Sequence, residues 1–388
     1  MEQEHQSHQG KNWYDKSYKW LLLIPAIMLV LSLAYLYQFN LKNGDVIYKD
    51  VTLTGGTTVS VFDRTADMSK LEETLKEKFV DIAIRGISDI RTGGQEGFIV
   101  ETKAGNEEIT SALEEYLGYK LTPDNSSIEF TGATLSTGFY QQLISAIIAA
   151  FLLMSWVVFL IFSHDKNIKG IVTMLTFLGV ALVLPTVSLL RTFSGIMIFI
   201  GLIYGFFRGD KNKNKRYFVI GTAVLAYLIF FLYTRLWVVG IVGIVLIGLF
   251  VYYSIPSFAV ILSAFADIAM TVAVVDMVGL NLSIAGVIAF LMLIGYSVDT
   301  DILLTSRLLK DKEGKVNQRM WSAFKTGMTM TLTSVAAVGI SLAIIYNFSD
   351  TLRQIFTIIM IGLGFDIVNT WFTNASMLKW YMEVKKIE

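Results

Sequence analysis

The chain lacks cysteine altogether and has little charge, proline or histidine. Of its 388 residues none is cysteine, 4 are proline, 3 are histidine and 16% are charged. Without cysteine, disulfides, thiolate metal sites and a cysteine nucleophile are excluded. His5 and His8 lie in a polar tail and His164 in a short predicted loop, so we expect no metal site, and no cofactor motif is present.

The scarcity of charge indicates a membrane protein. Soluble domains carry about a quarter charged residues, whereas this chain is 54% hydrophobic. Lys+Arg and Asp+Glu balance at 32 each, which leaves no overall basic surface to suggest a nucleic-acid partner.

Long apolar runs are what the chain has in abundance. A run of about 18 or more apolar residues is typical of a membrane-spanning helix. The chain has ten such runs. The spans at 192–207 and 236–254 are the weakest predictions, because 192–207 covers only 16 residues and the connections at Arg191 and Arg235 are very short. The predicted spans are 20–39, 139–162, 169–190, 192–207, 217–234, 236–254, 257–279, 283–309, 325–347 and 353–377.

Basic residues predict the orientation of these spans. Cytoplasmic loops are enriched in Lys and Arg, and the segments HDKNIK, RGDKNKNKR, KDKEGKVNQR and EVKK all fall on one side if the spans alternate. We therefore expect both termini, including the tail 1–18, in the cytoplasm and residues 41–138 outside. The polar start of the chain is not typical of a cleavable signal peptide.

The only long polar region, 41–138, reads as a small α+β domain. Strand-like alternation at 46–62, a helical pattern at 67–79, a hairpin around Gly93–Gly94, a second helix at 106–119 and a strand at 126–132 give the order β-α-β-β-α-β. This order is the ferredoxin-like split βαβ arrangement. Around it we predict a span at 19–40, a span at 139–163, an inserted membrane segment at 164–255 and a four-helix membrane core at 256–388.

Acidic residues within the last spans are the candidate functional groups. At 1.5 Å per residue, Asp267 and Asp366 fall near mid-membrane, where a charge costs several kcal/mol. Asp299 and Asp301 lie nearer the predicted cytoplasmic end, and Arg307 is close to the interface. On a helix Asp301 is about 200° from Asp299, so the two cannot line one cavity.

Two interpretations of these residues compete. In one, Arg307 follows the positive-inside rule and Asp301 lies near the headgroups. Stripes of Ser and Thr on the helix faces, such as Ser263 and Thr271 on either side of Asp267, then only join helices. In the other, desolvated carboxyls hold and release protons while helices repack, as a proton relay. Each charge crossing about 100 mV supplies roughly 2.3 kcal/mol.

Several motifs resemble the SecF family of protein-export membrane subunits, most closely its archaeal branch. They are TLTGGTTVSV, IPSFAVILSAFADIAMTVAV, LMLIGYSVDTDILLTSR and IGLGFDIVNTW, in this order. The resemblance assigns Gly55, Gly56 and Thr57 to the first motif and Gly295, Tyr296 and Ser297 to the family's Gly-Tyr-Ser. It further matches Asp267 to a family acid and Arg307 to an arginine implicated in proton transport.

The resemblance implies an RND-type half-transporter that pairs with a SecD-like subunit. It would assist a SecY-type channel in exporting unfolded polypeptides across the cytoplasmic membrane, coupled to the proton gradient, without acting as an enzyme. The partners implied are SecD, the channel, the translocating polypeptide and membrane lipids. Two departures stand out: the acid of the Asp299-Thr300-Asp301 motif is shifted by one position, and the segment 164–255 has no counterpart in a six-helix half, so we expect it to dock or face lipid.

Other functions share these features. A small-molecule or lipid transporter of the RND type would have the same spans and acids, and a scaffold that merely holds SecD would tolerate their loss. An intramembrane aspartyl protease needs a Tyr-Asp and a Gly-x-Gly-Asp motif, and the GLGFD sequence that ends at Asp366 has one residue too many.

Overall fold

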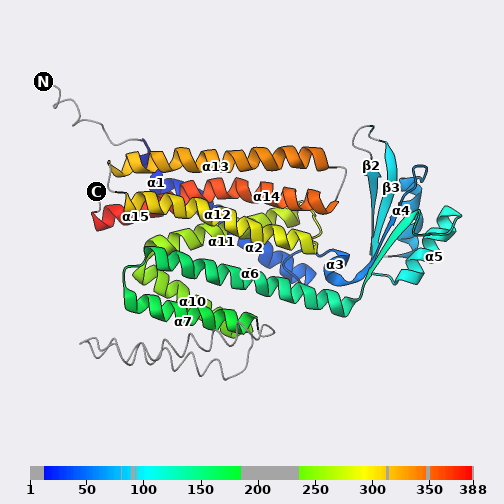
Figure 1. Ribbon diagram of the computed structural model, residues 1–388, viewed down its shortest axis with the longest axis horizontal. Coiled ribbons are helices and arrows are strands. Elements are labelled where there is room, and N and C mark those ends of the chain that lie inside the picture. Colours follow the sequence, from blue (N-terminus) through cyan, green and yellow to red (C-terminus); the bar gives the residue numbers. More distant parts are fainter. Residues whose placement is uncertain are drawn as a thin grey trace.

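The protein is an elongated helical bundle with a sheet domain at one end (Figure 1). The computed structural model describes residues 13–79, 81–88, 92, 94–184, 236–311, 314–346 and 350–386. Helices α1 and α15 lie at the opposite end of the bundle from the sheet, where the Tyr18 hydroxyl donates to Glu383 Oε2 at 2.5 Å. The first and last described segments are therefore neighbours.

The sheet domain has four strands in the order β2-β3-β1-β4, with every neighbouring pair antiparallel. Apolar side chains on alternate strand positions, such as Val59, Phe98 and Val100, pack with Leu71 of α4 and Leu113 of α5 into a closed core. Its elements are β1 Gly56–Val61, α4 Met68–Lys78, β2 Ile82–Ser88, β3 Gln95–Thr102, α5 Asn106–Leu117 and β4 Ser126–Thr131.

The first strand is shorter than the alternation at 46–62 predicts. Residues Val51–Thr54 form a helical turn, α3, and β1 begins only at Gly56. Gly55 and Gly56 have φ of +88° and +150°. A Cβ on Gly56 would lie 2.3 Å from the Thr102 carbonyl oxygen and one on Gly55 2.4 Å from Ala133 Cα. Only glycine fits such backbone approaches, which explains this pair of glycines.

Six helices within the described part of the chain are long and apolar enough to span a membrane. Pro25 has no amide hydrogen to offer the Leu21 carbonyl, and the first span accordingly divides at Leu22 into α1 and α2. The bundle helices are α1 Trp13–Leu21, α2 Leu23–Asn43, α6 Ala133–Phe162, α7 Lys166–Val183, α10 Leu236–Tyr253, α11 Ile255–Met277, α12 Ile284–Lys310, α13 Val316–Ile345, α14 Asp350–Val368, η1 Asn369–Asn374 and α15 Ala375–Lys385.

These helices differ in length from the predicted spans. The segments 169–190 and 236–254 correspond to the shorter apolar helices α7 and α10, whereas 192–207 and 217–234 lie outside the described residues. Helix α6 starts at Ala133, inside the region predicted as external, and α13 starts at Val316, nine residues before 325. Hydropathy marks only the stretch that fits the hydrocarbon layer, whereas helical hydrogen bonding continues through the flanking polar residues.

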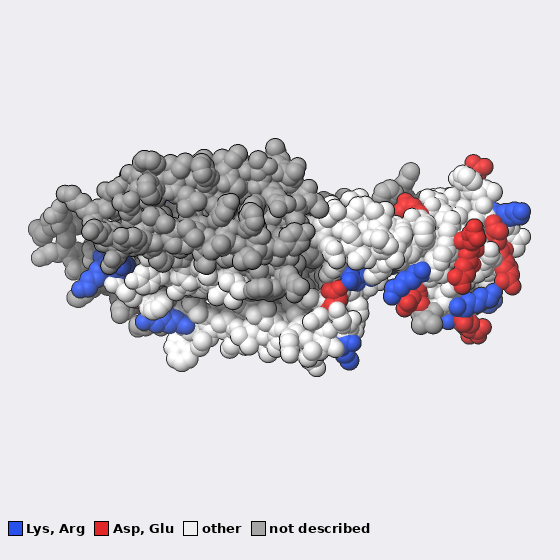
Figure 2. Space-filling model, turned by 90° about the horizontal axis from the view of Figure 1, so that it is seen from below, with Lys and Arg blue, Asp and Glu red and all other residues white. Residues whose placement is uncertain are grey.

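The charged side chains that are visible on one face of the molecule lie away from the middle of the bundle surface. On the face in Figure 2, those of the described residues gather over the sheet domain and at the two ends of the bundle, and the described surface between them is uncharged. Apolar side chains are also exposed on the bundle helices α2 and α13, where Val30, Leu31 and Ile340 are each more than 60% exposed. Such a belt is expected of a surface that faces lipid.

Candidate functional site

Asp267 lies in the middle of α11 with no exposed surface. Its Oδ2 accepts a hydrogen bond from the Ser297 hydroxyl of α12 at 2.5 Å, and its Oδ1 accepts one from Asn369 Nδ2 at 2.7 Å. The carboxyl group of α11 therefore joins two other helical segments. Thr271, one turn further along α11, donates its hydroxyl to the Asp267 carbonyl at 2.6 Å.

Asp301 forms a second contact of the same kind one turn beyond Ser297 on α12. Its carboxylate Oδ1 accepts a hydrogen bond from Asn374 Nδ2 at 2.8 Å, and its side chain is fully buried. Asp366 of α14, 1% exposed, accepts from the Thr370 hydroxyl at 3.2 Å. We call Asp267, Asp301, Asp366, Ser297, Asn369, Thr370 and Asn374 the polar network.

The three carboxyl groups of the polar network lie close enough to interact electrostatically with one another. None of the described Lys or Arg residues forms an ion pair with Asp267, Asp301 or Asp366. Three like charges in a dry interior repel one another strongly, because the low dielectric constant leaves Coulomb interactions unscreened. An arrangement without cations is therefore suited to groups that carry protons.

A π-helical segment, η1, supplies the two amides of the network. In an α-helix five residues turn by about 500°, which would separate Asn369 and Asn374 by roughly 140°. The i→i+5 hydrogen bonds of a π-helix make five residues about one turn, so both amides point the same way. Asn369 thereby reaches Asp267 and Asn374 reaches Asp301. Short π segments are frequent at functional sites.

Three buried polar atoms of the network region have no hydrogen-bond partner: Asp301 Oδ2, Asn374 Oδ1 and the Ser263 hydroxyl. An unpaired buried oxygen costs about 1–3 kcal/mol. A proton on Asp301 would turn Oδ2 from an acceptor into a donor. The region thus has spare hydrogen-bonding capacity that depends on whether Asp301 is protonated.

The structure separates the other residues singled out from the sequence. Asp299 is exposed on the opposite side of α12 from Asp301 and lies outside the polar network. Gly295 is exposed and Tyr296 is 46% exposed. Arg307, near the end of α12, donates to the Ser322 hydroxyl of α13 at 2.7 Å. Of the Gly-Tyr-Ser motif, only its serine enters the network.

The Gly-Gly-Thr motif lies at the sheet domain instead. Thr57 is fully buried, and its hydroxyl donates to the Ala104 carbonyl at 2.8 Å. Together with the close approaches of Gly55 and Gly56, this contact fixes the start of β1. Among the described residues no group of three or more His, Asp or Glu side chains is arranged to hold a metal ion.

The turn between α11 and α12 is bonded to the segment that leads into the sheet domain. Lys49 forms a parallel bridge with Leu282, in which the Leu282 amide donates to the Tyr48 carbonyl at 2.7 Å and the Asp50 amide to the Leu282 carbonyl at 2.9 Å. At the end of α11, Asp276 Oδ1 accepts from the Tyr48 amide at 3.2 Å. The same helix thus contacts the network at Asp267 and the sheet domain's entry segment at Asp276.

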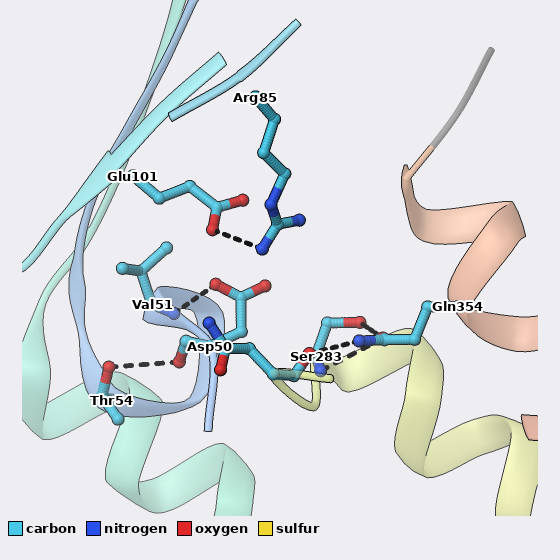
Figure 3. A network of polar contacts seen from close by, with 8 residues as sticks. Asp50, Val51, Thr54, Arg85, Glu101, Ser283 and Gln354 are labelled. Carbon is cyan, nitrogen blue, oxygen red and sulfur yellow. Dashed lines mark hydrogen bonds and ion pairs between the residues drawn. The ribbon is translucent and has the colours of Figure 1, made fainter. Parts of the chain in front are cut away.

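Gln354 of α14 clamps the same turn. Its side chain accepts from the Ser283 amide at 3.2 Å and from the Ser283 hydroxyl, and donates to the Asn281 carbonyl. Figure 3 shows Asp50 between this clamp and the ion pair of Arg85 and Glu101 on the sheet. Bundle and sheet domain are therefore joined by directed hydrogen bonds.

Sequence reasoning missed Asn374, Thr370, Asp276 and Gln354. The spacing of Asn369 and Asn374 could have suggested a π segment, but the same spacing on an α-helix places them on different faces. Asp276 and Gln354 lie near helix ends, where polar residues are ordinary, so nothing in the sequence distinguishes them.

Comparison with known proteins finds similarity to protein-export membrane proteins. Residues 208–384 match the family described as "Protein export membrane protein SecD/SecF, C-terminal". The chain is 50% identical over 131 residues, 33% of this chain, to the protein-export membrane protein SecF of Methanolacinia petrolearia, of which the match spans 46%. It is 27% identical over 376 residues to SecF of Methanocaldococcus jannaschii, covering 95% of this chain and 96% of that protein.

A solved structure shares the fold. The crystal structure of SecDF, a translocon-associated membrane protein from Thermus thermophilus, matches with a TM-score of 0.52 at 12% identity, covering 97% of this chain and 39% of that one. Fold and buried carboxyls together define a polytopic helical membrane protein with a domain outside the bundle. The chain is therefore similar to SecF protein-export membrane proteins, over nearly its whole length in one relative and over about a third of it in the others.

Proposed function

We propose that this protein is the SecF-like accessory subunit of the Sec translocon, which with a SecD-like partner assists export of unfolded polypeptides and uses the proton gradient. The observation that carries the coupling is the polar network, in which three buried carboxyls on three helices accept hydrogen bonds from amide and hydroxyl donors and form no ion pair with a described cation. Loading or releasing one proton there changes which of these hydrogen bonds can form.

A path from the network to the sheet domain supports this proposal. Helix α11 carries Asp267 at its centre and Asp276 at the end that contacts Tyr48. Helices α12 and α14 meet the same turn through Ser283 and Gln354. A repacking of α11, α12 and α14 would therefore reach the Lys49–Leu282 bridge, and through it the start of the ferredoxin-like domain.

The exposed face of helix α13 is evidence that a partner subunit binds to the bundle. Only 6% of the most apolar stretch of α13 is buried within this chain, and that helix exposes Thr329 and Thr333, whose hydroxyls bond to carbonyls of α13 itself. A helix of this kind can pack closely against a second helix. In our proposal the SecD-like subunit covers α13, the SecY-type channel lies beyond the pair, and lipid covers the remaining apolar surface.

The orientation belongs to the same proposal. The Lys-rich segments adjoining α6, α12 and α15 all lie at the end of the bundle away from the sheet (Figure 1). With that end in the cytoplasm, the sheet domain is outside the cell membrane, where an emerging polypeptide would meet it.

The proposal is tested by export assays on membranes that carry the full complex. Asp267→Asn, Asp301→Asn and Asp366→Asn remove the exchangeable proton with little change in shape, so we expect at least one to lose the stimulation of export that depends on the proton gradient. Asp299→Asn is the matched control, because Asp299 is exposed on the same helix as Asp301, and it should export like the wild type.

Equal export by all four variants, with and without an uncoupler, would identify a scaffold that only holds SecD. Retained function in the complex together with transport of a small molecule by the purified chain would favour an RND-type exporter. Cleavage of a membrane peptide that disappears in Asp366→Asn would point to a protease.

A further inference from the structure

The last turn of α11 carries a buried carboxyl group, Asp276, that lies outside the polar network. The residue is only 3% exposed. Its Oδ1 accepts a hydrogen bond from the Tyr48 amide at 3.2 Å, whereas its Oδ2 is buried and has no hydrogen-bond partner. One oxygen of this carboxyl group therefore holds the chain that leads into the sheet domain, and the other is unsatisfied.

Residues 45–50, which we call the entry segment, are attached to the bundle partly through this contact. The Tyr48 amide donates to Asp276, and the Tyr48 carbonyl accepts from the Leu282 amide at 2.7 Å. The Asp50 amide donates in turn to the Leu282 carbonyl at 2.9 Å. Because the entry segment continues directly into α3 and β1, a loss of the Asp276 contact would weaken the attachment of the sheet domain to α11.

The surroundings of Asp276 disfavour a negative charge on its side chain. A carboxylate in the last turn of a helix opposes the helix dipole, and burial removes the water that would stabilise it. Asp45 lies close enough to repel it, and no ion pair of Asp276 is found among the described residues. Against these effects stands one hydrogen bond, from the Tyr48 amide.

The nearby ion pair leaves Asp276 without a counterion. Lys49 pairs with Asp45. Burial of Asp45 opposes its ionisation, but the hydrogen bonds from Lys49 and from the Val46 amide outweigh this effect and lower the pKa of Asp45. Asp45 is therefore charged at neutral pH, and Lys49 balances that charge. The described titratable groups that face Asp276 are Asp45 with its partner Lys49, Tyr48, Tyr35 of α2 and Tyr140 of α6.

We propose that Asp276 is a proton-dependent positioning residue, which holds the entry segment on the end of α11 when it is protonated and loosens it when it is ionised. A neutral carboxyl group still accepts from the Tyr48 amide, and an unsatisfied oxygen costs less on a neutral group than on a charged one. The contact is therefore strongest at low pH and weakens as the pH rises. That protons from outside the cell operate it rests on the orientation in the proposed function.

The test is hydrogen exchange of the full chain, purified in uncharged detergent, between about pH 5 and pH 8, where a buried carboxyl group can change its charge. Rates are corrected for the intrinsic pH dependence of exchange. In the wild type, protection of the entry segment should fall about tenfold as the pH rises, the factor that corresponds to one unsatisfied buried acceptor. The amides of β1 are the internal reference, because the contacts of Asp63 and Tyr119 are intact throughout this range.

Asp276→Asn keeps an acceptor for the Tyr48 amide and cannot ionise, so its entry segment should stay protected over the whole range. Glu129→Gln removes an exposed carboxyl group from β4 and is the matched control, which should keep the wild-type pH dependence. Each variant is compared with itself across the pH range, so a change in overall stability does not alter the result.

The proposal is overturned if protection of the wild-type entry segment does not depend on pH, if the dependence persists in Asp276→Asn, or if it is lost in Glu129→Gln. The experiment does not measure export. Its failure is therefore distinct from a failure of the proposed function, which is tested by export with the variants of Asp267, Asp301 and Asp366.

Discussion

At the scale of single residues, the polar network is held by amides rather than by counterions. Asn369 and Asn374 each give one N–H to a carboxyl that belongs to another helix. An amide stabilises a carboxyl group in either protonation state, since it offers both a donor and an acceptor. A lysine in the same place would fix the carboxylate as a charged partner and would prevent a relay.

Replacing Asn369 by Ala should lower the free energy of unfolding by about 1–3 kcal/mol, because it leaves Asp267 Oδ1 buried without a donor. Thr333→Ala on α13 is the control: its hydroxyl is exposed and bonds only to carbonyls of its own helix, so its effect should stay within about 0.5 kcal/mol. Denaturation in mixed micelles measures both. Equal effects would show that the Asn369 contact contributes nothing.

In the sheet domain, Asp63 accepts hydrogen bonds from the Thr65 hydroxyl, the Thr65 amide and the Tyr119 hydroxyl, each at 2.7 Å. The two bonds from Thr65 are the main reason that the pKa of Asp63 is lowered. Burial, followed by the contact with Asp63, raises the pKa of Tyr119 to about 12. The pair therefore contributes stability only while Asp63 is charged and Tyr119 is neutral.

The sign of the pH dependence follows from these two shifts. The contribution of Asp63 is fully present above its unfolded pKa of about 3.9 and is lost as the pH falls through the lower, folded value. That of Tyr119 is present below about 10 and disappears as the pH rises toward 12. Hydrogen exchange of the β1 amides in the full chain, corrected for intrinsic rates, should show both losses, and Asp63→Asn should flatten the acidic one.

At the scale of elements, the network depends on how closely α12 and α14 approach. Gly362 permits this approach, because a Cβ there would lie 2.3 Å from Leu293 Cδ2. Leu293 is fully buried, and in a close-packed interior a shift of its side chain would disturb its neighbours. Gly364, on the same helix, has no atom within 4 Å of its would-be Cβ.

Gly362→Ala should therefore destabilise the bundle by about 1–3 kcal/mol through overpacking. Gly364→Ala should be neutral or stabilise by roughly 0.5–1 kcal/mol, since alanine is the better helix former. Unfolding in mixed micelles measures both variants. A loss of stability in Gly364→Ala as large as in Gly362→Ala would show that helix propensity, and not packing on Leu293, explains the effect.

At the scale of the whole molecule, the absence of cysteine makes the orientation directly testable. Lys103→Cys on the sheet domain and Lys385→Cys at the end of α15 each introduce one exposed thiol. In intact cells a membrane-impermeant maleimide should label Lys103→Cys and leave Lys385→Cys unlabelled until the membrane is opened. The reverse pattern would invert the proposed orientation.

Lys213→Cys tests the region outside the described residues. Two predicted spans, 169–190 and 192–207, lie between the cytoplasmic segment HDKNIK and Lys213 and return the chain to the cytoplasm. The thiol of Lys213→Cys should therefore behave like that of Lys385→Cys. Labelling in intact cells would show that this segment crosses the membrane an odd number of times before residue 213.

Local patterns predicted much of this architecture. Apolar runs identified the six long helices, and alternation with turn residues located the hairpin of β2 and β3. Both signals are local, because a helix or strand face repeats within a few residues. The sequence missed α3 and the early start of α6, since turns and polar helix ends lack such a repeat.

The sequence by itself determined that Asp299 and Asp301 point in opposite directions, because the helical period fixes the angle between them. Only the tertiary structure decided that Asp301 faces the interior and Asp299 does not, since that choice depends on which neighbours cover α12. The hydrogen-bond partners of these acids are also far from them in the sequence: 102 positions separate Asp267 from Asn369, and 73 separate Asp301 from Asn374. Contacts of this kind arise from helix packing and from the π segment, and no short-range pattern encodes them.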